Sequence, residues 1–197
     1  MKITKIEMYP QDELIRRLRE VTLTDGVTKP YAESEIMIQN YFYFGWENLK
    51  FAQRYVLKSD HDKIKEMDNA LDKFGMRILD MKTFYQITTD TGEVFPYIPP
   101  VVEWAKEGEK WVHYVSDGMH RLDYLCRNYC GNPYIIIIKN PSAPYYALPS
   151  DMTWEDLELH DTPPKVKKTY RDPDNYKALF RDYNSQFPGI QKDRSKK

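Results

Sequence analysis

The segment YIIIIKN, residues 134–140, restricts the fold more than any other part of the chain. Its four consecutive isoleucines do not alternate with polar residues, which is typical of a strand that is buried on both faces. The preceding chain predicts a strand over residues 109–117 and then a helix over residues 119–130, which a Gly-Asn-Pro sequence ends. From residue 76 the order is strand, extended proline-rich segment, strand, helix and strand, which predicts a compact α/β unit with a mixed sheet.

Helical patterns precede this unit. Apolar residues recur at spacings of three and four along residues 10–21 and 59–74, and residues 33–57 also have a largely helical pattern. Residues 1–75 are therefore expected to form a helical N-terminal extension.

The rest of the chain is divided on similar grounds. Residues 76–145 are expected to form the core, and residues 146–190 to pack on it as a C-terminal segment that includes a helix over residues 173–187. Residues 191–197 are rich in charge and are expected to be a disordered tail. All parts together are expected to form one compact domain.

The composition narrows the class of protein. A chain of 197 residues, 41% hydrophobic and 30% charged, is typical of one soluble globular domain. A net charge of −1 argues against a dedicated DNA-binding domain, although it leaves a local basic patch open.

The sequence has no signal peptide and no apolar window near the ~20 residues that span a membrane, so no membrane partner is expected. Cys126 and Cys130 lie four residues apart on one helix, which disfavours a disulfide and favours reduced thiols in the cytoplasm.

The sequence Asp117-Gly118-Met119-His120-Arg121 joins the predicted strand to the predicted helix. A helix N-terminus has unpaired N–H groups and the positive end of the helix dipole, so it is suited to bind an anion. The glycine permits a tight turn, the arginine offers a fork of donors for phosphate, and the histidine can donate or move a proton. The aspartate could cap the helix, accept a proton or hold a metal.

A purely structural role is the alternative for this turn. Asp-Gly is a common turn sequence, and Asp is a common residue at the start of a helix. An arginine in the first turn could pair with a nearby acid such as Asp123 or Glu103.

The sequence YVSDGMHRLDYL, followed by a helix and then YIIIIK, resembles the N-terminal domain of the ParB/sulfiredoxin superfamily. The resemblance covers about residues 76–140, and the segment YIPPVVEW is similar to the extended stretch before the turn in that superfamily. The most similar pattern is that of the free-serine kinases, whose turn reads Asp-Gly-His-x-Arg. Asp117, Gly118 and Arg121 match this pattern at the same spacing.

The resemblance implies a ParB/sulfiredoxin-like mixed sheet and a nucleotide (ATP, ADP or CTP) bound at the helix N-terminus, usually with Mg²⁺. It places the phosphate groups on Gly118, Met119, His120 and Arg121. It also favours transfer of a phosphoryl group to a small hydroxylated acceptor, with His120 stabilising the charge that develops on that group. Asp117 or Glu103 would accept the proton of the acceptor or hold the metal, whose ligands the sequence does not identify.

Differences between this sequence and the superfamily pattern bear on which of the superfamily's activities the chain could have. Met119 occupies the position of the cysteine that sulfiredoxins need, and only about 57 residues follow the unit, fewer than a partition protein uses for its DNA-binding domain and dimerisation tail. The glutamate that the serine kinases use as base is not placed, and its candidates are Glu103, Glu33 and Glu35. Two alternatives stay open: a nucleotide-binding switch without enzymatic activity, and a DNA-associated ParB-like nuclease.

Overall fold

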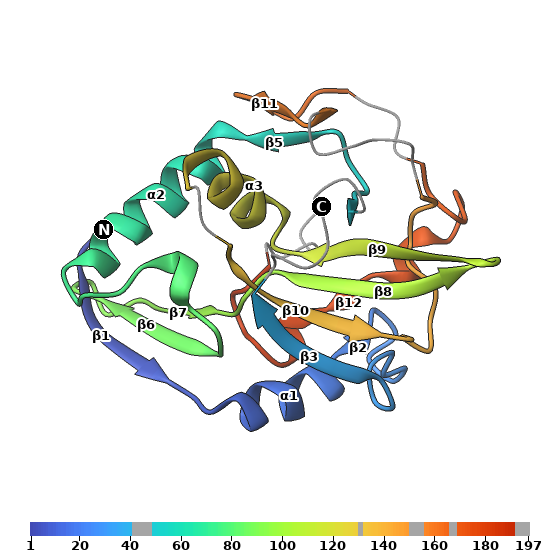
Figure 1. The fold of residues 1–197 in the computed structure, drawn as a ribbon, viewed down its shortest axis with the longest axis horizontal. Helices are drawn as coiled ribbons and strands as arrows, with labels where there is room; N and C mark the ends of the chain where they lie inside the picture. The colour runs from blue at the N-terminus through green and yellow to red at the C-terminus, as the bar shows by residue number, and fades with distance from the viewer. Residues whose placement is uncertain (41–48, 130–131, 150–155, 166–168, 192–197) are drawn as a thin grey trace.

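A computed structural model describes residues 1–40, 49–129, 132–149, 156–165 and 169–191. Its centre is a five-stranded mixed sheet with the order β3-β10-β8-β9-β4 (Figure 1). The strands are β3 (Glu35–Asn40), β4 (Leu49–Lys50), β8 (Val101–Glu107), β9 (Lys110–Asp117) and β10 (Tyr134–Lys139). Strand β10 pairs parallel to β8 and antiparallel to β3, while β8 and β9 form an antiparallel hairpin.

The isoleucines of β10 are buried on both faces, as the sequence predicted. Ile136 and Ile138 pack in one hydrophobic cluster with Leu14 and Leu18 of helix α1 (Gln11–Arg19). Ile135 and Ile137 pack in a second cluster, on the side of helix α3 (Met119–Asn128). Because successive side chains of a strand point to opposite faces, a strand that lies between two clusters needs apolar residues at every position.

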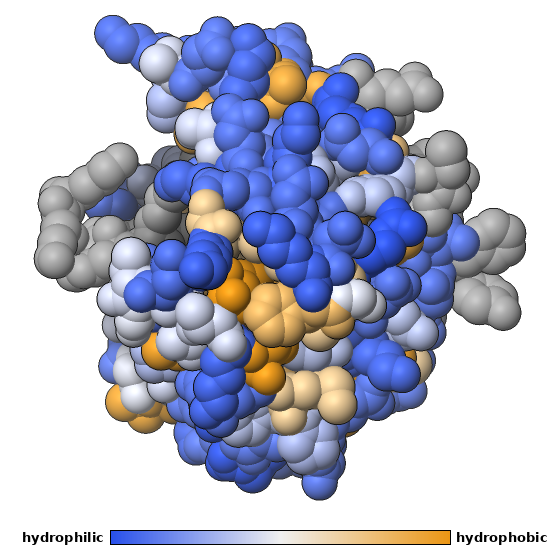
Figure 2. Space-filling view, turned by 90° about the vertical axis from the view of Figure 1, so that its left-hand side faces the viewer, coloured by the Kyte–Doolittle hydropathy of each residue, from blue (hydrophilic) through white to orange (hydrophobic). Residues whose placement is uncertain are grey.

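A second sheet packs beside the first. It consists of β1 (Ile3–Met8), β6 (Tyr85–Thr89) and β7 (Val94–Tyr97), all antiparallel. A third hydrophobic cluster joins this sheet to α3 and to helix α2 (Lys58–Asp72). Figure 2 shows hydrophobic surface gathered on this side of the molecule and surrounded by hydrophilic residues; Met8 and Val94 are exposed side chains of this sheet.

Short elements complete the fold. Strand β11 (Glu158–His160) pairs with β5 (Tyr55–Leu57), and β12 (Arg181–Asp182) pairs with β2 (Thr22–Leu23). Short 3₁₀ turns span Ile78–Asp80, Tyr176–Leu179 and Tyr183–Ser185. No helix within the described residues is both long and apolar enough to cross a membrane. Cys126 is a half-buried free thiol, and Cys130 lies outside the described residues.

The mixed α/β fold is confirmed, but two predicted helical regions are wrong. Within residues 33–57, the described part forms β3, β4 and β5, so residues 1–75 are not mostly helical. The physical reason is that Ile36 and Ile38 pair with the isoleucines of β10, a partner almost a hundred residues away that a local pattern does not include.

The predicted helix over residues 173–187 is replaced by 3₁₀ turns and by β12. The side chain of Asp172 accepts hydrogen bonds from the backbone N–H groups of Asp174 and Asn175, which favours a turn over a helix. Arg181 then enters the core as the partner of a buried carboxylate, so the chain is extended at that point.

Candidate functional site

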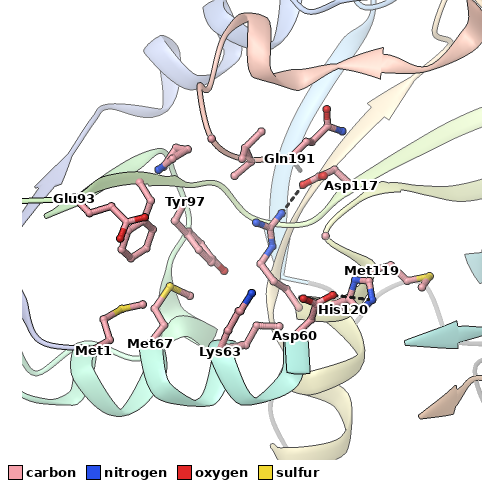
Figure 3. A pocket seen from close by; sticks show the side chains of 17 residues that line it. Met1, Asp60, Lys63, Met67, Glu93, Tyr97, Asp117, Met119, His120 and Gln191 are labelled. Carbon is pink, nitrogen blue, oxygen red and sulfur yellow. Dashed lines mark hydrogen bonds and ion pairs between the residues drawn. The ribbon is translucent and has the colours of Figure 1, made fainter. Parts of the chain in front are cut away.

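The residues of the predicted turn line a pocket of about 500 Å³. The pocket lies where the N-terminus of α3 meets α2, β7 and the C-terminal residues 189–191 (Figure 3). Asp117, Gly118, Met119, His120 and Arg121 all contribute to its wall. The structure therefore brings the predicted phosphate-binding residues together at one cavity.

Gly118 has a backbone conformation and a packing environment that only glycine satisfies. Its φ of 81° is in the left-handed region, and a Cβ atom there would lie 2.8 Å from Arg121 Nη2 and 2.9 Å from Pro100 Cα. The Gly118 carbonyl accepts the first helical hydrogen bond of α3, from the N–H of Leu122 at 2.9 Å. The geometry of an α-helix directs the first N–H groups of α3 out of its N-terminus.

Arg121 folds back over this glycine and forms an ion pair with Asp117. Its Nη2 atom donates to Asp117 Oδ2 at 2.5 Å, and its guanidinium carbon lies 5.4 Å from the centre of the Tyr97 ring. The Nε atom is buried and has no hydrogen-bond partner within the described residues. An unpaired buried donor is costly, and such groups occur where a ligand, ion or water completes a site.

His120 approaches a carboxylate of another helix. Its Nε2 atom lies 3.4 Å from Asp60 Oδ2, in the first turn of α2, and both residues line the pocket. A carboxylate at this distance can orient the imidazole ring. Asp60 was not among the residues that the sequence indicated, because only the packing of α2 against α3 brings it to the turn.

Three further polar residues of the pocket come from distant parts of the chain. Lys63 lies one turn after Asp60 on α2, Glu93 precedes β7, and Gln191 lies near the end of the described chain. Lys63 has no ion-pair partner within the described residues, and its side chain points into the pocket (Figure 3). The sequence did not indicate any of these three residues. Asp60 and Lys63 are three residues apart on α2 and therefore share a face, but only the packing of α2 places that face at the turn.

Glu103 is not part of this pocket. It is 0% exposed, and Arg181 contacts both of its oxygens, with Nε to Oε1 and Nη2 to Oε2 each at 2.8 Å. Tyr31 donates to Oε1 at 2.6 Å and Ser116 donates to it at 2.8 Å. Burial, with a smaller contribution from the Glu103 charge, raises the pKa of Tyr31, so this phenol stays protonated and keeps donating.

The prediction of Glu103 as a proton acceptor or metal ligand therefore does not fit the structure, because its oxygens are occupied and removed from solvent. Glu35 is exposed, begins β3 and has its Oε2 atom 3.7 Å from Lys139 Nζ. Neither Glu35 nor Glu33 lines the pocket. No cluster of three or more His, Cys, Asp or Glu side chains suited to a metal exists within the described residues.

The ParB CE domain family matches residues 13–158 of the chain, which is well over half of its length. The chain belongs to the ParB CE domain family. The matched range contains β8, β9, α3 and β10 with the turn at residues 117–121, which confirms the ParB-like resemblance. No curated protein and no solved structure matches the chain. The free-serine kinase resemblance stays a prediction.

Proposed function

We propose that this ParB CE domain protein binds a nucleotide in the pocket at the N-terminus of α3 and transfers a phosphoryl group to a small hydroxylated molecule. The observation that carries the proposal is the convergence of the turn at residues 117–121, Lys63 and the buried unpaired Nε of Arg121 on one cavity. A volume of about 500 Å³ is in the range of pockets for small molecules and cofactors.

The lining of the pocket offers both kinds of surface that a nucleotide needs. Arg121, Lys63 and the first N–H groups of α3 provide donors and positive charge for phosphate oxygens. Met67, Phe95 and Tyr97 also line the pocket and provide apolar and aromatic surface for a base, with Tyr97 next to the Arg121 guanidinium. Figure 3 shows Met67 and Tyr97 to one side of Asp117.

Magnesium fits this site as part of the nucleotide complex and not as an ion in a cage of its own. Mg²⁺ is usually bound by one or two carboxylates together with substrate phosphates. Asp60 and Asp117 line the pocket and are the carboxylates that would hold it, although Asp117 is engaged by Arg121. When bound, the ion would neutralise phosphate charge.

Proton transfer is best assigned to His120, with Asp60 as its partner. The acceptor oxygen would form a bond to the phosphorus, the bond to the leaving nucleotide oxygen would break, and the acceptor proton would pass to the imidazole. Asp60, 3.4 Å from His120 Nε2, would stabilise the imidazolium. Asp117 fixes the guanidinium of Arg121 and would share that contact with the bound ion.

Calorimetric titration of the protein with ATP, ADP, CTP and GTP, each with and without Mg²⁺, tests nucleotide binding. Arg121→Ala is expected to weaken binding by roughly thirtyfold, because one charge-assisted hydrogen bond is worth about 2 kcal/mol. Arg19→Ala is the matched control, since Arg19 is exposed and does not line the pocket. If the wild-type chain binds none of the four nucleotides, or if Arg121→Ala binds as tightly as wild type, the proposal is wrong.

Measurement of nucleotide turnover then distinguishes phosphoryl transfer from nucleotide binding alone. A phosphotransferase consumes the nucleotide only when a hydroxylated acceptor is present, and His120→Ala abolishes that consumption while nucleotide affinity changes less. The engagement of Asp117 by Arg121 favours the alternative of a binding switch. Tight binding with equally slow turnover in the presence and absence of a screen of small alcohols would support that alternative.

A further inference from the structure

One face of strand β7 forms a row of side chains along the pocket. Tyr97 and Phe95 of β7 line the cavity, and so does Glu93, which directly precedes the strand. The Glu93 carbonyl accepts from the Thr89 N–H at 2.9 Å, so the pairing of β7 with β6 continues to this residue. Residues two apart on an extended chain point to the same face, which places Glu93, Phe95 and Tyr97 on the pocket side, whereas Val94 is 53% exposed.

The row leads away from the phosphate-binding turn. Tyr97 is its nearest member, because the guanidinium carbon of Arg121 lies 5.4 Å from the centre of the Tyr97 ring. Glu93 is four residues from Tyr97, which is about 13 Å along an extended strand. Figure 3 shows Glu93 on the far side of Tyr97 from Asp117. A nucleotide whose phosphates lie at Arg121 can therefore extend along the two rings with its base toward Glu93.

The carboxylate of Glu93 is available to a ligand. Glu93 is exposed, and its side chain has no hydrogen bond or ion pair within the described residues. A carboxylate repels phosphate groups, so its position favours the orientation in which the phosphates lie at Arg121 and Lys63 and the base lies at the other end of the row. An ionised carboxylate is also an acceptor only, so it binds groups that donate.

Nucleobases differ in what they present to such an acceptor. Adenine and cytosine carry an exocyclic amino group that donates, and guanine carries one at N2, whereas uracil has a carbonyl oxygen where cytosine has its amino group. Hypoxanthine, the base of ITP, likewise has a carbonyl in place of the adenine amino group and lacks the N2 amino group of guanine. A carboxylate attracts an amino group and repels a carbonyl oxygen.

We propose that Glu93 is a specificity-determining residue, whose carboxylate accepts a hydrogen bond from the exocyclic amino group of a base that lies along Phe95 and Tyr97. This inference rests on the proposed nucleotide binding. It adds selection of the base, which the turn at residues 117–121 does not provide, because the donors of that turn suit phosphate oxygens.

The test is the ratio of two dissociation constants, measured by calorimetric titration with Mg²⁺ present. The nucleotide that wild type binds is compared with its counterpart that lacks the amino group, which is UTP for CTP and ITP for ATP or GTP. Wild type is expected to bind the amino nucleotide about tenfold more tightly, because hydrogen bonds to a charged group are the stronger ones. Glu93→Gln keeps the size of the side chain but can donate as well as accept, so the ratio is expected to fall to within about twofold.

Glu109→Gln is the matched control. It makes the same change at an exposed glutamate in the turn between β8 and β9, which does not line the pocket, and its ratio is expected to equal that of wild type. Because each ratio compares two ligands on one protein, a general loss of affinity cancels. Glu93→Ala removes the acceptor altogether and should lose the preference in the same way, which provides a second variant if thermal unfolding shows that Glu93→Gln does not fold.

The outcomes separate this inference from the proposed function. A wild-type ratio near one, a ratio that folded Glu93→Gln or Glu93→Ala leaves unchanged, or an equal loss in Glu109→Gln would overturn the role of Glu93 while leaving nucleotide binding intact. Lack of binding of every nucleotide by wild type would instead overturn the proposed function, and the inference with it.

Discussion

Replacement of Gly118 by alanine tests whether the neighbours of Gly118, including Arg121, leave no room for a side chain at the turn. Two costs add at this residue. An L-residue at a φ of 81° costs about 1–2 kcal/mol relative to an ordinary conformation. The new methyl group would also lie 2.8 Å from Arg121 Nη2 and 2.9 Å from Pro100 Cα, and overpacking of this kind costs typically about 1–3 kcal/mol.

Gly92 provides the matched control. Its φ is 80°, almost the same as that of Gly118, but a Cβ atom there meets nothing within 4 Å. Gly92→Ala should therefore show the backbone cost without the contacts, and the effect of the extra methyl group on the unfolded chain is common to both variants. The difference between the two unfolding free energies is expected to be about 1–3 kcal/mol, with Gly118→Ala less stable.

Urea unfolding at equilibrium measures this difference, with equal slopes in urea as the check that both variants unfold alike. Gly118→Ala should also weaken nucleotide binding, since the nearer clash is with the guanidinium. In an Arg121→Ala background the clash with Nη2 is absent, so the cost of Gly118→Ala should decrease. Equal destabilisation by Gly92→Ala and Gly118→Ala would refute the view that Gly118 is required by its neighbours.

Two further changes probe the buried groups. Arg181→Met leaves the fully buried Glu103 carboxylate without its partner, and it is expected to lower the free energy of unfolding in urea by about 3–5 kcal/mol. The double change Glu103→Leu, Arg181→Met should lower it much less. Equal losses of stability in the two proteins would show that the unpaired carboxylate is not the main cause of the destabilisation. His61 lies on α2, with its Nε2 atom 2.9 Å from the buried carboxylate of Asp123. Burial outweighs the effect of this carboxylate and lowers the pKa of His61 in the folded protein below its ordinary value near 6.5. The unfolded chain therefore binds more protons there, and stability should fall as the pH drops through about 6.5. His61→Gln should flatten the unfolding free energy measured between pH 8 and pH 5, and parallel curves for the two proteins would contradict this assignment.

The part of the fold that was predictable from sequence is the part whose signals are local. In the unit β9, α3 and β10, a strand ends at Asp-Gly, a helix follows with apolar residues at helical spacing, and a wholly apolar strand comes next. The turn at residues 117–121 lies inside this unit, so its position at a helix N-terminus followed directly. The match at residues 13–158 includes the whole unit.

The missed parts depend on contacts between distant residues. Strand β3 forms because β10 offers it a partner, and the chain around Arg181 is extended because Glu103 binds its guanidinium. Both stretches contain apolar residues at spacings that also fit a helix, so a local pattern favours the wrong element. The same reason explains the pocket: Asp60, Lys63 and Gln191 reach the turn only through packing of α2 and of the C-terminal segment.

Glu103 illustrates how the same residue type can serve either chemistry or structure. In the sequence it ends the extended segment before the turn, which is where a catalytic carboxylate would be expected. In the sheet it pairs with Tyr114 of β9, and its side chain is enclosed with Tyr31, Ser116 and Arg181. A carboxylate so fully hydrogen-bonded cannot accept a further proton or ligand without breaking the network. This network holds Arg181 and Tyr183 against the central sheet, so its role is to keep the C-terminal segment in place beside the pocket.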